Sequence, residues 1–202
     1  MDHLLLGTRN EGKIREIQEL MADLSAIELL TFADRPFSEV EETGETFLDN
    51  ALLKACSICE ETALPVLAED AGLEVVALGG APGVRSARFS GEPVDFERNN
   101  RLLLDRLDGI RDRRARFITV AALRLPDGQT FVCTGILPGR ISDMPIGEGG
   151  FGYDPLFIPE GETRTLAEMR LEEKNRISHR RRAIGRMRLL LCDLISAGEL
   201  TA

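Results

Sequence analysis

The sequence contains no tryptophan, one tyrosine and only two histidines among its 202 residues. With only His3 and His179 present, a zinc site built on several histidines is excluded. Four cysteines are too few to predict a disulfide scaffold in a chain of this length. Cys56-Ser-Ile-Cys59 matches C-x-x-C, but no second such pair exists. We therefore expect buried thiols here rather than a metal or redox site.

The sequence also lacks long apolar runs and an excess of positive charge. No run approaches the roughly 18 residues that span a bilayer, and the N-terminus has neither the basic region nor the apolar stretch of a signal peptide. We expect a cytoplasmic protein without a membrane partner. The net charge of −9 repels phosphate backbones, which argues against nucleic acid as a partner. Ordinary hydrophobicity (43%) and the absence of a linker predict a single domain over residues 1–202.

The N-terminal segment predicts an α/β fold. Leu4-Leu5-Leu6 is typical of a buried strand, and the residues after Asn10 have an apolar stripe at helical spacing. A strand that leads through a polar turn into a helix is the usual start of such a fold. We expect a second strand at residues 27–32 and a brief strand at 66–68 that ends just before Glu69-Asp70.

Capping and turn signals mark several later elements. Thr46 and Asp49 predict a capping box at the start of a helix. Asp127-Gly128 predicts a hairpin between strands at 117–125 and 130–137. Residues 94–107 are expected to be helical, and so are residues 172–196 as one last helix that ends near Gly198.

Two glycine-containing segments could bind a nucleotide. Thr8-Arg9-Asn10-Glu11-Gly12-Lys13 joins a strand tip to a helix start, where backbone N–H groups and a lysine suit a phosphate. The alternative is a capped helix with a surface lysine. Gly147 to Gly152 satisfies G-x-G-x-x-G, but Pro155 prevents a helix from opening there. We expect a loop that presents Phe151, Tyr153 and Asp154. The two aromatic rings either stack on a base or fill the core.

Acidic pairs indicate a possible metal site. Glu69-Asp70, together with Glu41-Glu42 upstream, offers the oxygen ligands that Mg²⁺ prefers. A further carboxylate beside the metal could act as the base for an attacking water. The alternative is an ordinary acidic surface.

The last strongly charged segment is basic. From Arg170 to Arg188 there are eight basic residues and two acidic ones, a local +6 that leaves −15 for the remaining chain. Basic residues at a helix start oppose the helix dipole unless an anion or an acidic neighbour compensates them. A solvated charged face is the ordinary alternative.

Taken together and in order, these segments resemble one known family. The matching segments are Thr8-x-Asn10-x-x-Lys13, Glu41-Glu42-Thr43-Gly44-x-Thr46-Phe47-x-x-Asn50-Ala51-x-x-Lys54-Ala55, Ala68-Glu69-Asp70-x-Gly72-Leu73, Leu78-Gly79-Gly80-Ala81-Pro82-Gly83-Val84-x-Ser86-Ala87-Arg88, Gly149-Gly150-Phe151-Gly152-Tyr153-Asp154-Pro155 and Glu173-Lys174-Asn175-x-Ile177-Ser178-His179-Arg180. Nearly end to end, the chain is similar to the non-canonical purine nucleoside triphosphate pyrophosphatases, also called inosine or xanthosine triphosphate pyrophosphatases.

This resemblance implies an elongated α/β fold with a long mixed sheet flanked by helices, in two lobes with the nucleotide in a cleft between them. It also implies a homodimer that depends on Mg²⁺. The implied reaction is the hydrolysis of ITP, dITP and XTP to the nucleoside monophosphate and pyrophosphate.

The resemblance also assigns roles to residues. Asp70 would be the catalytic carboxylate and a metal ligand, supported by Glu69 and by Glu41 or Glu42. The other residues would bind the substrate's phosphates or base, and they are Thr8, Arg9, Asn10, Glu11, Gly12, Lys13, Lys54, Ala71, Phe151, Gly152, Tyr153, Asp154, Lys174, His179 and Arg180. Three positions depart from the family's common pattern: Arg9 replaces Gly, Glu69 replaces Asp and Ala71 replaces Ser.

Two alternatives are carried forward. One is a pyrophosphatase of similar fold that acts on pyrimidine or modified nucleotides. The other is a nucleotide-binding module with little catalytic activity.

Overall fold

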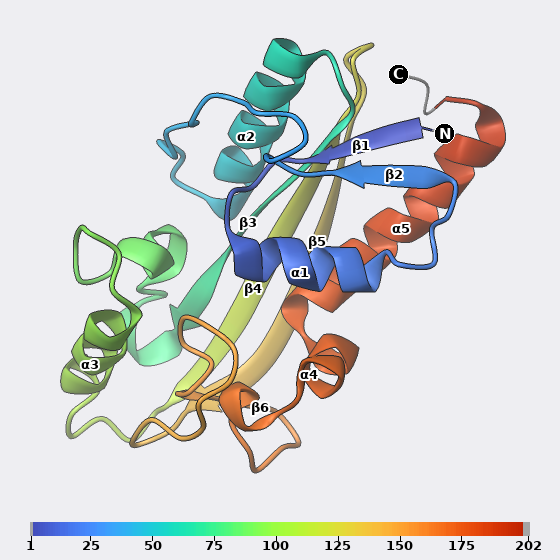
Figure 1. The fold of residues 1–202 in the computed structure, drawn as a ribbon. Helices are drawn as coiled ribbons and strands as arrows, with labels where there is room; N and C mark the ends of the chain where they lie inside the picture. Colours follow the sequence, from blue (N-terminus) through green and yellow to red (C-terminus); the bar gives the residue numbers. More distant parts are fainter. Residues whose placement is uncertain (1, 200–202) are drawn as a thin grey trace. The chain divides into compact units, whose positions relative to one another are not determined.

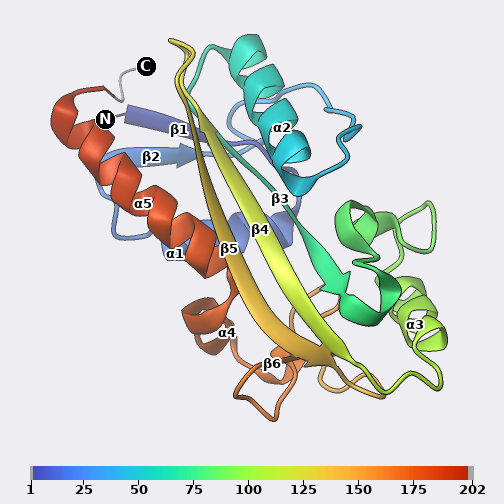
Figure 2. The same ribbon diagram turned by 180° about the vertical axis from the view of Figure 1, so that it is seen from behind.

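The structure, a computed structural model that describes residues 2–199, contains one six-stranded mixed sheet in the order β2-β1-β3-β4-β5-β6 (Figures 1 and 2). β1 pairs in parallel with both β2 and β3, whereas β5 and β6 are antiparallel. The strands are β1 (Asp2–Leu6), β2 (Ile27–Leu30), β3 (Val66–Val75), β4 (Arg114–Arg124), β5 (Thr130–Ile141) and β6 (Phe157–Pro159). The predicted mixed sheet flanked by helices is confirmed.

Five α-helices accompany the sheet in the described part of the chain. They are α1 (Glu11–Leu20), α2 (Phe47–Thr62), α3 (Phe96–Arg106), α4 (Leu171–Ile177) and α5 (His179–Ala197). None of these helices is long and apolar enough to cross a membrane.

The chain divides into two compact units, each with its own core. The first comprises Met1–Asp70, Thr119–Gly135 and Arg180–Ala202, and the second comprises Ala71–Ile118 and Ile136–His179. The single domain expected over residues 1–202 stays a prediction.

In the first unit, the alternation of side chains along β1 sorts the helices onto two faces. Leu4 and Leu6 belong to one buried cluster with the apolar stripes of α1 and α5. Gly7, one position further, faces the other way, where a Cβ would lie 3.0 Å from Val66 and Ala68 and 3.2 Å from Ile58 of α2. Successive residues of a strand point to opposite faces. The sheet therefore has α1 and α5 on one face and α2 on the other.

The second unit buries apolar side chains from the end of β3, the start of β4 and the end of β5 against α3. Leu73 and Val75 of β3 pack in one cluster with Leu103 and Leu107, and the cluster also includes Tyr153. These residues are almost fully buried. The core thereby fixes the loop that carries residues 151–154.

Several predicted elements are confirmed. Thr46 and Asp49 form the capping box of α2, and the chain between β4 and β5 turns at Gly128, whose φ is +99°. The backbone N–H of Leu125 donates to the carbonyl oxygen of Gln129 at 2.9 Å, which closes the hairpin. α5 ends at Ala197, immediately before Gly198. The four cysteines are free thiols, and of the two thiols expected to be buried, Cys59 is buried and Cys56 is half-buried.

Two expectations about secondary structure are wrong. The strand expected to end at residue 68 continues to Val75, so Glu69 and Asp70 lie within β3 and not at its end. The polar pair interrupts the apolar pattern, but both side chains are buried because other elements supply partners for them. The last helix, expected over 172–196, is broken at Ser178, whose backbone is extended (φ −60°, ψ 155°) and separates α4 from α5.

Candidate active site

Glu69 and Asp70 are neighbours on β3, and the strand turns their side chains toward opposite faces of the sheet. Asp70 contacts α2, whereas Glu69 contacts residues of α1 and α5. Both side chains are buried, with exposed fractions of 1% for Glu69 and 5% for Asp70. The two acids that looked like one pair in the sequence therefore occupy two different environments.

α2 supplies the partners of Asp70. The Asn50 side-chain nitrogen donates to Asp70 Oδ2 at 3.2 Å, and Lys54 Nζ lies 3.5 Å from Oδ1. The four-residue spacing puts Asn50 and Lys54 on one face of the helix, as the sequence predicts. Lys54 also pairs with Glu42 Oε1 at 2.5 Å. Two carboxylates thus converge on one ammonium group.

The loop before α2 is held by the same helix. Asn50 Oδ1 accepts from the backbone N–H of Gly44 at 2.8 Å. A Cβ at Gly44 would lie 2.5–3.0 Å from Asp49 and Asn50, so glycine is the residue that fits this close approach. The contact places Glu42 beside Lys54. Its neighbour Glu41 is exposed.

Burial makes Asp70 an unusual carboxyl group. Desolvation raises its pKa above the ordinary value, while the nearby Lys54 ammonium works in the opposite direction. Glu42 adds a repulsion that raises the pKa further. A cation placed near Asp70 and Glu42 would relieve both effects.

On the other face, Glu69 binds the guanidinium of Arg180. Arg180 Nε lies 2.9 Å from Glu69 Oε2, and Nη2 lies 2.8 Å from Oε1, which is a two-pronged arrangement. Glu16 of α1 accepts a further hydrogen bond from Arg180 Nη1. Burial opposes a charged guanidinium, but Glu69 and Glu16 raise the pKa of Arg180 above its usual range.

Lys13 completes this cluster. Its Nζ lies 3.4 Å from Glu69 Oε1, and desolvation by burial lowers the pKa of the ammonium even though Glu69 works to raise it. The side chain of Lys13 is only 17% exposed. Two cations and two carboxylates, Lys13, Arg180, Glu16 and Glu69, are therefore buried together without net charge.

The segment 8–13 forms the capped helix start that its sequence predicts. Asn10 is the N-cap of α1, and its Oδ1 accepts from the backbone N–H of Lys13 at 3.0 Å. Thr8 Oγ1 accepts from the N–H of Asn10 at 3.2 Å. Glu11 and Gly12 form the first turn of the helix. Lys13 therefore lies in the first turn of α1, and a helix N-terminus favours anions.

The Arg9 side chain makes its contacts with residues outside this helix start. Its guanidinium lies 4.3 Å from the centroid of the Phe32 ring and donates to the backbone carbonyl of Phe37 at 2.5 Å. These contacts tie the segment to the chain that follows β2. A contribution of Arg9 to phosphate binding stays a prediction.

In the second unit, Asp154 organises the glycine-rich loop. Asp154 Oδ2 accepts from Lys174 Nζ at 2.7 Å and from the backbone N–H of Phe151 at 2.9 Å. Lys174 Nζ also lies 4.8 Å from the centroid of the Phe151 ring. Gly150 has a φ of +73°, and a Cβ there would lie 2.0 Å from Asp154 Oδ2, so this turn requires glycine.

Tyr153 is a core residue and not a ring presented by the loop. It is 4% exposed, and its hydroxyl donates to the carbonyl oxygen of Ser86 at 2.9 Å. Burial raises the pKa of its phenol. The sequence left open whether these aromatic rings stack on a base or fill the core, and Tyr153 fills the core. Phe151 is half-buried.

The remaining predicted residues of the second unit are also held firmly. The Gly152 carbonyl accepts from the Asn100 side chain at 3.1 Å. The His179 ring stacks on Phe117, with centroids 4.7 Å apart and planes 12° apart, and is 5% exposed. Ala71 is half-buried in β3.

The residues around Asp70 fit a hard cation such as Mg²⁺. In the described residues no group of three or more His, Cys, Asp or Glu side chains forms a closed metal cage. Magnesium commonly binds one or two carboxylates and completes its shell with water and substrate phosphates. Asp70 and Glu42 provide that donor set, whereas the Glu69 oxygens accept from Arg180.

Sequence reasoning did not assign a role to Glu16. One signal was available, because Glu16 lies three residues after Lys13 and so shares a face of α1 with it. Its exposed fraction is 2%. Nothing in the local sequence links α1 to Arg180, which is 164 positions away.

The fold and these polar clusters define a mixed α/β protein with a buried carboxylate beside lysines. Within that class, residues 4–189 match the family model of the Ham1 family. The chain therefore belongs to the Ham1 family.

Three proteins of known name are similar to this chain over most of its length. A protein of Deinococcus deserti named dITP/XTP pyrophosphatase is 50% identical over 182 residues, which cover 90% of this chain and 85% of that protein. A Thermus thermophilus protein of the same name is 50% identical over 183 residues, with 90% and 87% coverage. The structure of a HAM1 protein from Coxiella burnetii superposes with a TM-score of 0.88 at 37% identity, over 96% of this chain and 100% of that one.

The burial of Asp70 predicts a pH-dependent effect of Asp70→Asn on stability. In metal-free protein at neutral pH the folded state holds an unfavourably buried charge, since the pKa is raised above 3.8. We expect Asp70→Asn to raise the melting temperature there. The gain should be complete above the raised pKa and vanish below 3.8, where Asp70 is protonated in both states. Thermal melts from pH 3 to 8 measure this, with the exposed Asp108→Asn as control. A gain that does not change with pH would contradict it.

The Glu69–Arg180 contact predicts a large loss of stability on Glu69→Gln. The substitution leaves a buried guanidinium short of one negative charge, which costs about 3–5 kcal/mol of unfolding free energy. Urea unfolding at pH 7 measures the loss. Glu60→Gln, at an exposed position of α2, is the matched control and should change stability by less than about 0.5 kcal/mol. Equal effects of the two substitutions would show that the pair contributes nothing.

Proposed function

We propose that this chain hydrolyses non-canonical purine nucleoside triphosphates (ITP, dITP and XTP) to the nucleoside monophosphate and pyrophosphate. The observation that carries the proposal is the buried Asp70 beside Lys54 and Asn50 in a member of the Ham1 family. Relatives at 50% identity named dITP/XTP pyrophosphatase support the substrate class. Such an activity would remove deaminated purine nucleotides from the precursor pool.

The proposed reaction is attack of water on the α-phosphorus. The water oxygen forms a bond to this phosphorus, the bond to the bridging oxygen breaks, and pyrophosphate leaves with the bonding electrons. Asp70 is assigned as the base that takes the proton of the attacking water. A raised pKa suits this task because it makes the carboxylate a better proton acceptor.

Asp70 and Glu42 would hold a Mg²⁺ ion in this site. Bound there, the ion would neutralise charge on the phosphate oxygens. Lys13 and Lys54 are assigned to the triphosphate, and the residues around Asn10 to its terminal phosphates. Glu69 is assigned to hold Lys13 and Arg180 in place, since its oxygens already serve both.

The recognition of the base is assigned from the resemblance to Phe151, Gly152, Asp154, Lys174, His179 and Arg180. A 6-oxo purine offers an acceptor where adenine offers a donor, so a site that donates to this position rejects adenine. Lys174 carries such a donor. A homodimer and a cytoplasmic location are proposed on the same ground.

The first test is the substrate profile of the purified protein. With MgCl₂, we expect ITP, dITP and XTP to give pyrophosphate and monophosphate, and ATP to react at least about 100-fold more slowly. Ion-exchange chromatography of the products measures both quantities. Asp70→Asn should lower turnover by about 10²–10⁴-fold while nucleotide binding persists. Orthophosphate as the product, equal use of ATP, or preference for dTTP or UTP would reject the proposal.

The second test separates the two neighbouring acids Glu41 and Glu42. Only Glu42 lies beside Lys54 and Asp70, so Glu42→Gln should raise the Mg²⁺ concentration for half-maximal activity by at least about tenfold. Glu41→Gln, at an exposed position one residue away, should leave it within about twofold. Magnesium titrations of ITP hydrolysis measure both. An equal response of the two variants would remove Glu42 from the proposed metal site.

A further inference from the structure

A pocket of about 630 Å³ opens in the second unit, where the segment between α3 and β4 meets the end of β5. The backbone N–H of Ile141 donates to the carbonyl of Arg113 at 2.9 Å and joins these two segments. Charged residues dominate the lining, and they are Arg111, Arg113, Arg114, Arg140, Asp112 and Asp143. None of them has a role in the proposed hydrolysis.

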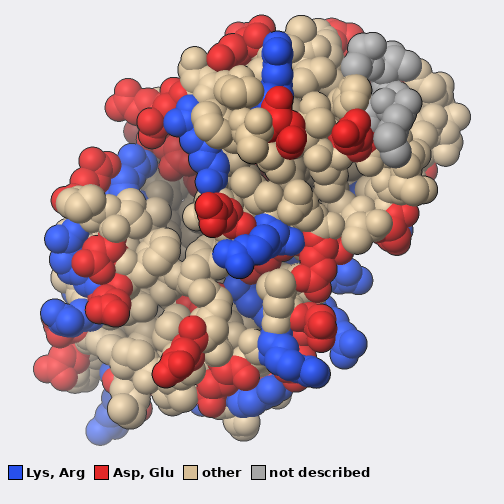
Figure 3. All heavy atoms as spheres, viewed as in Figure 1, with Lys and Arg blue, Asp and Glu red and all other residues tan. Residues whose placement is uncertain are grey.

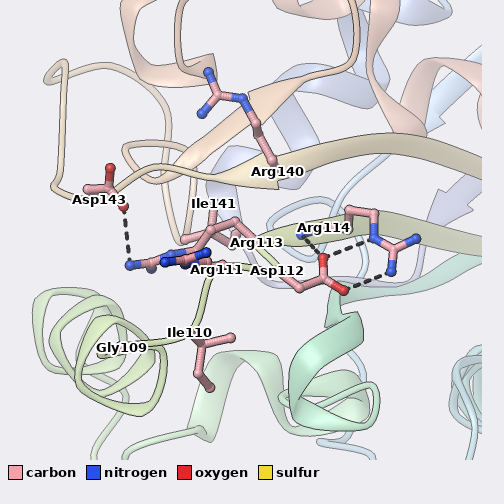
Figure 4. A pocket seen from close by; sticks show the side chains of 9 residues that line it. All are labelled: Gly109, Ile110, Arg111, Asp112, Arg113, Arg114, Arg140, Ile141 and Asp143. Carbon is pink, nitrogen blue, oxygen red and sulfur yellow. Dashed lines mark hydrogen bonds and ion pairs between the residues drawn. The ribbon is translucent and has the colours of Figure 1, made fainter.

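Both aspartates of this pocket are already paired. Asp112 accepts from Arg114 at 2.9 and 2.7 Å, and this contact lowers its pKa to about 2. Asp143 Oδ1 lies 3.2 Å from Arg113 Nη2. Figure 4 shows these two pairs separately, with Asp112 turned toward Arg114 and Asp143 reaching Arg113 from the other side. Four arginines against two aspartates leave a local charge of +2 in a protein whose net charge is −9.

One donor of this cluster is buried without a hydrogen-bond partner among the described residues. It is Nη1 of Arg113, whose side chain is only 20% exposed. A buried charged donor without an acceptor costs more free energy than a neutral one, and an anion close to the Arg113 guanidinium would lower this cost. Arg111 and Arg140 are exposed and have no ion pair within the described part of the chain.

The backbone alternates through Arg111, Asp112 and Arg113. The side chains of Arg111 and Arg113 extend in the same direction in Figure 4, and Asp112 between them turns the opposite way. Both arginines line the pocket. The pocket is thus lined by two guanidinium groups from this segment, while the intervening acid pairs with Arg114.

We propose that this pocket is an anion-binding site, separate from the candidate active site, that takes a diphosphate group with Arg111 and Arg113 as its main ligands. The planar guanidinium presents paired donors that match phosphate oxygens, and a diphosphate offers oxygens to two such groups at once. Pockets of this volume accommodate small-molecule ligands. The apolar side chains of its lining are Ile110 and Ile141, so the pocket offers no aromatic surface on which a base could stack.

The diphosphate can come from two sources, free pyrophosphate or the phosphates of a nucleotide. Titration of ¹⁵N-labelled protein with inorganic pyrophosphate and, separately, with GDP distinguishes them at constant ionic strength. We expect amide signals of residues 109–114 and 141 to shift and saturate with both ligands, and with similar affinity, because the pocket contacts phosphate alone. Signals of residues 8–13 report the candidate active site in the same spectra.

Arg111→Ala tests the ligand assignment at an exposed position where folding is not at risk. We expect it to weaken pyrophosphate binding at residues 109–114 by about tenfold, the loss of one charge-assisted hydrogen bond. The double variant Arg111→Ala/Arg113→Ala should abolish saturation there. Arg101→Ala removes the same charge from an exposed position of α3 and should leave binding unchanged.

Three results would overturn the proposal. The first is a linear shift without saturation, which is the response of a general ionic atmosphere. The second is saturation by sulfate with the same affinity as pyrophosphate, which would remove the preference for a diphosphate. The third is an equal effect of Arg101→Ala and Arg111→Ala, which would show that only the net charge matters.

Discussion

The candidate active site depends on the alternation of side chains along β3. Two adjacent carboxylates cannot share one environment in a strand, because consecutive residues point to opposite faces. Asp70 meets Asn50 and Lys54 on the face covered by α2. Glu69 meets Lys13 and Arg180 on the face covered by α1 and α5. The backbone thereby gives the two acids different partners, Asn50 and Lys54 for Asp70 and two cations, Lys13 and Arg180, for Glu69.

Burying the charged groups around Glu69 costs free energy, and this cost explains which residues form the cluster. Burying Arg180 alone would be very unfavourable, and two carboxylates from distant segments make the burial possible. Lys13 adds the charge that balances the second carboxylate. A cluster of fixed charges does not have to reorganise when a substrate's charge develops, and such preorganisation is the main electrostatic contribution to catalysis. The cluster forms only when β3, α1 and α5 are packed together, so the geometry of the site depends on the completed fold.

The sequence predicted the features that rest on local rules. The capping box at Thr46, the turn at Gly128 and the helix end at Gly198 each follow from the chemistry of one or two residues. The mixed sheet and the family followed from ordered motifs. What failed depends on distant partners. The strand was expected to end at Ala68 because a buried acid pair looks implausible until Arg180 and Lys54 are placed beside it. Likewise, the sequence predicts one continuous helix over residues 172–196, and only the extended backbone of Ser178 shows where it breaks.

The basic segment shows how a charge count can mislead without a structure. The +6 of residues 170–188 suggested one positive surface that faces an anionic substrate. Arg180 is instead buried among carboxylates, and Arg188 pairs with Asp23. On the face seen in Figure 3, basic and acidic side chains are interspersed over the surface. The charges of Arg180 and Arg188 are therefore balanced by acidic residues of the chain itself. A site for an anionic ligand is therefore indicated by basic side chains whose acidic neighbours pair with other residues, and not by the sign of the net charge. Asp112 is such a neighbour, because it pairs with Arg114.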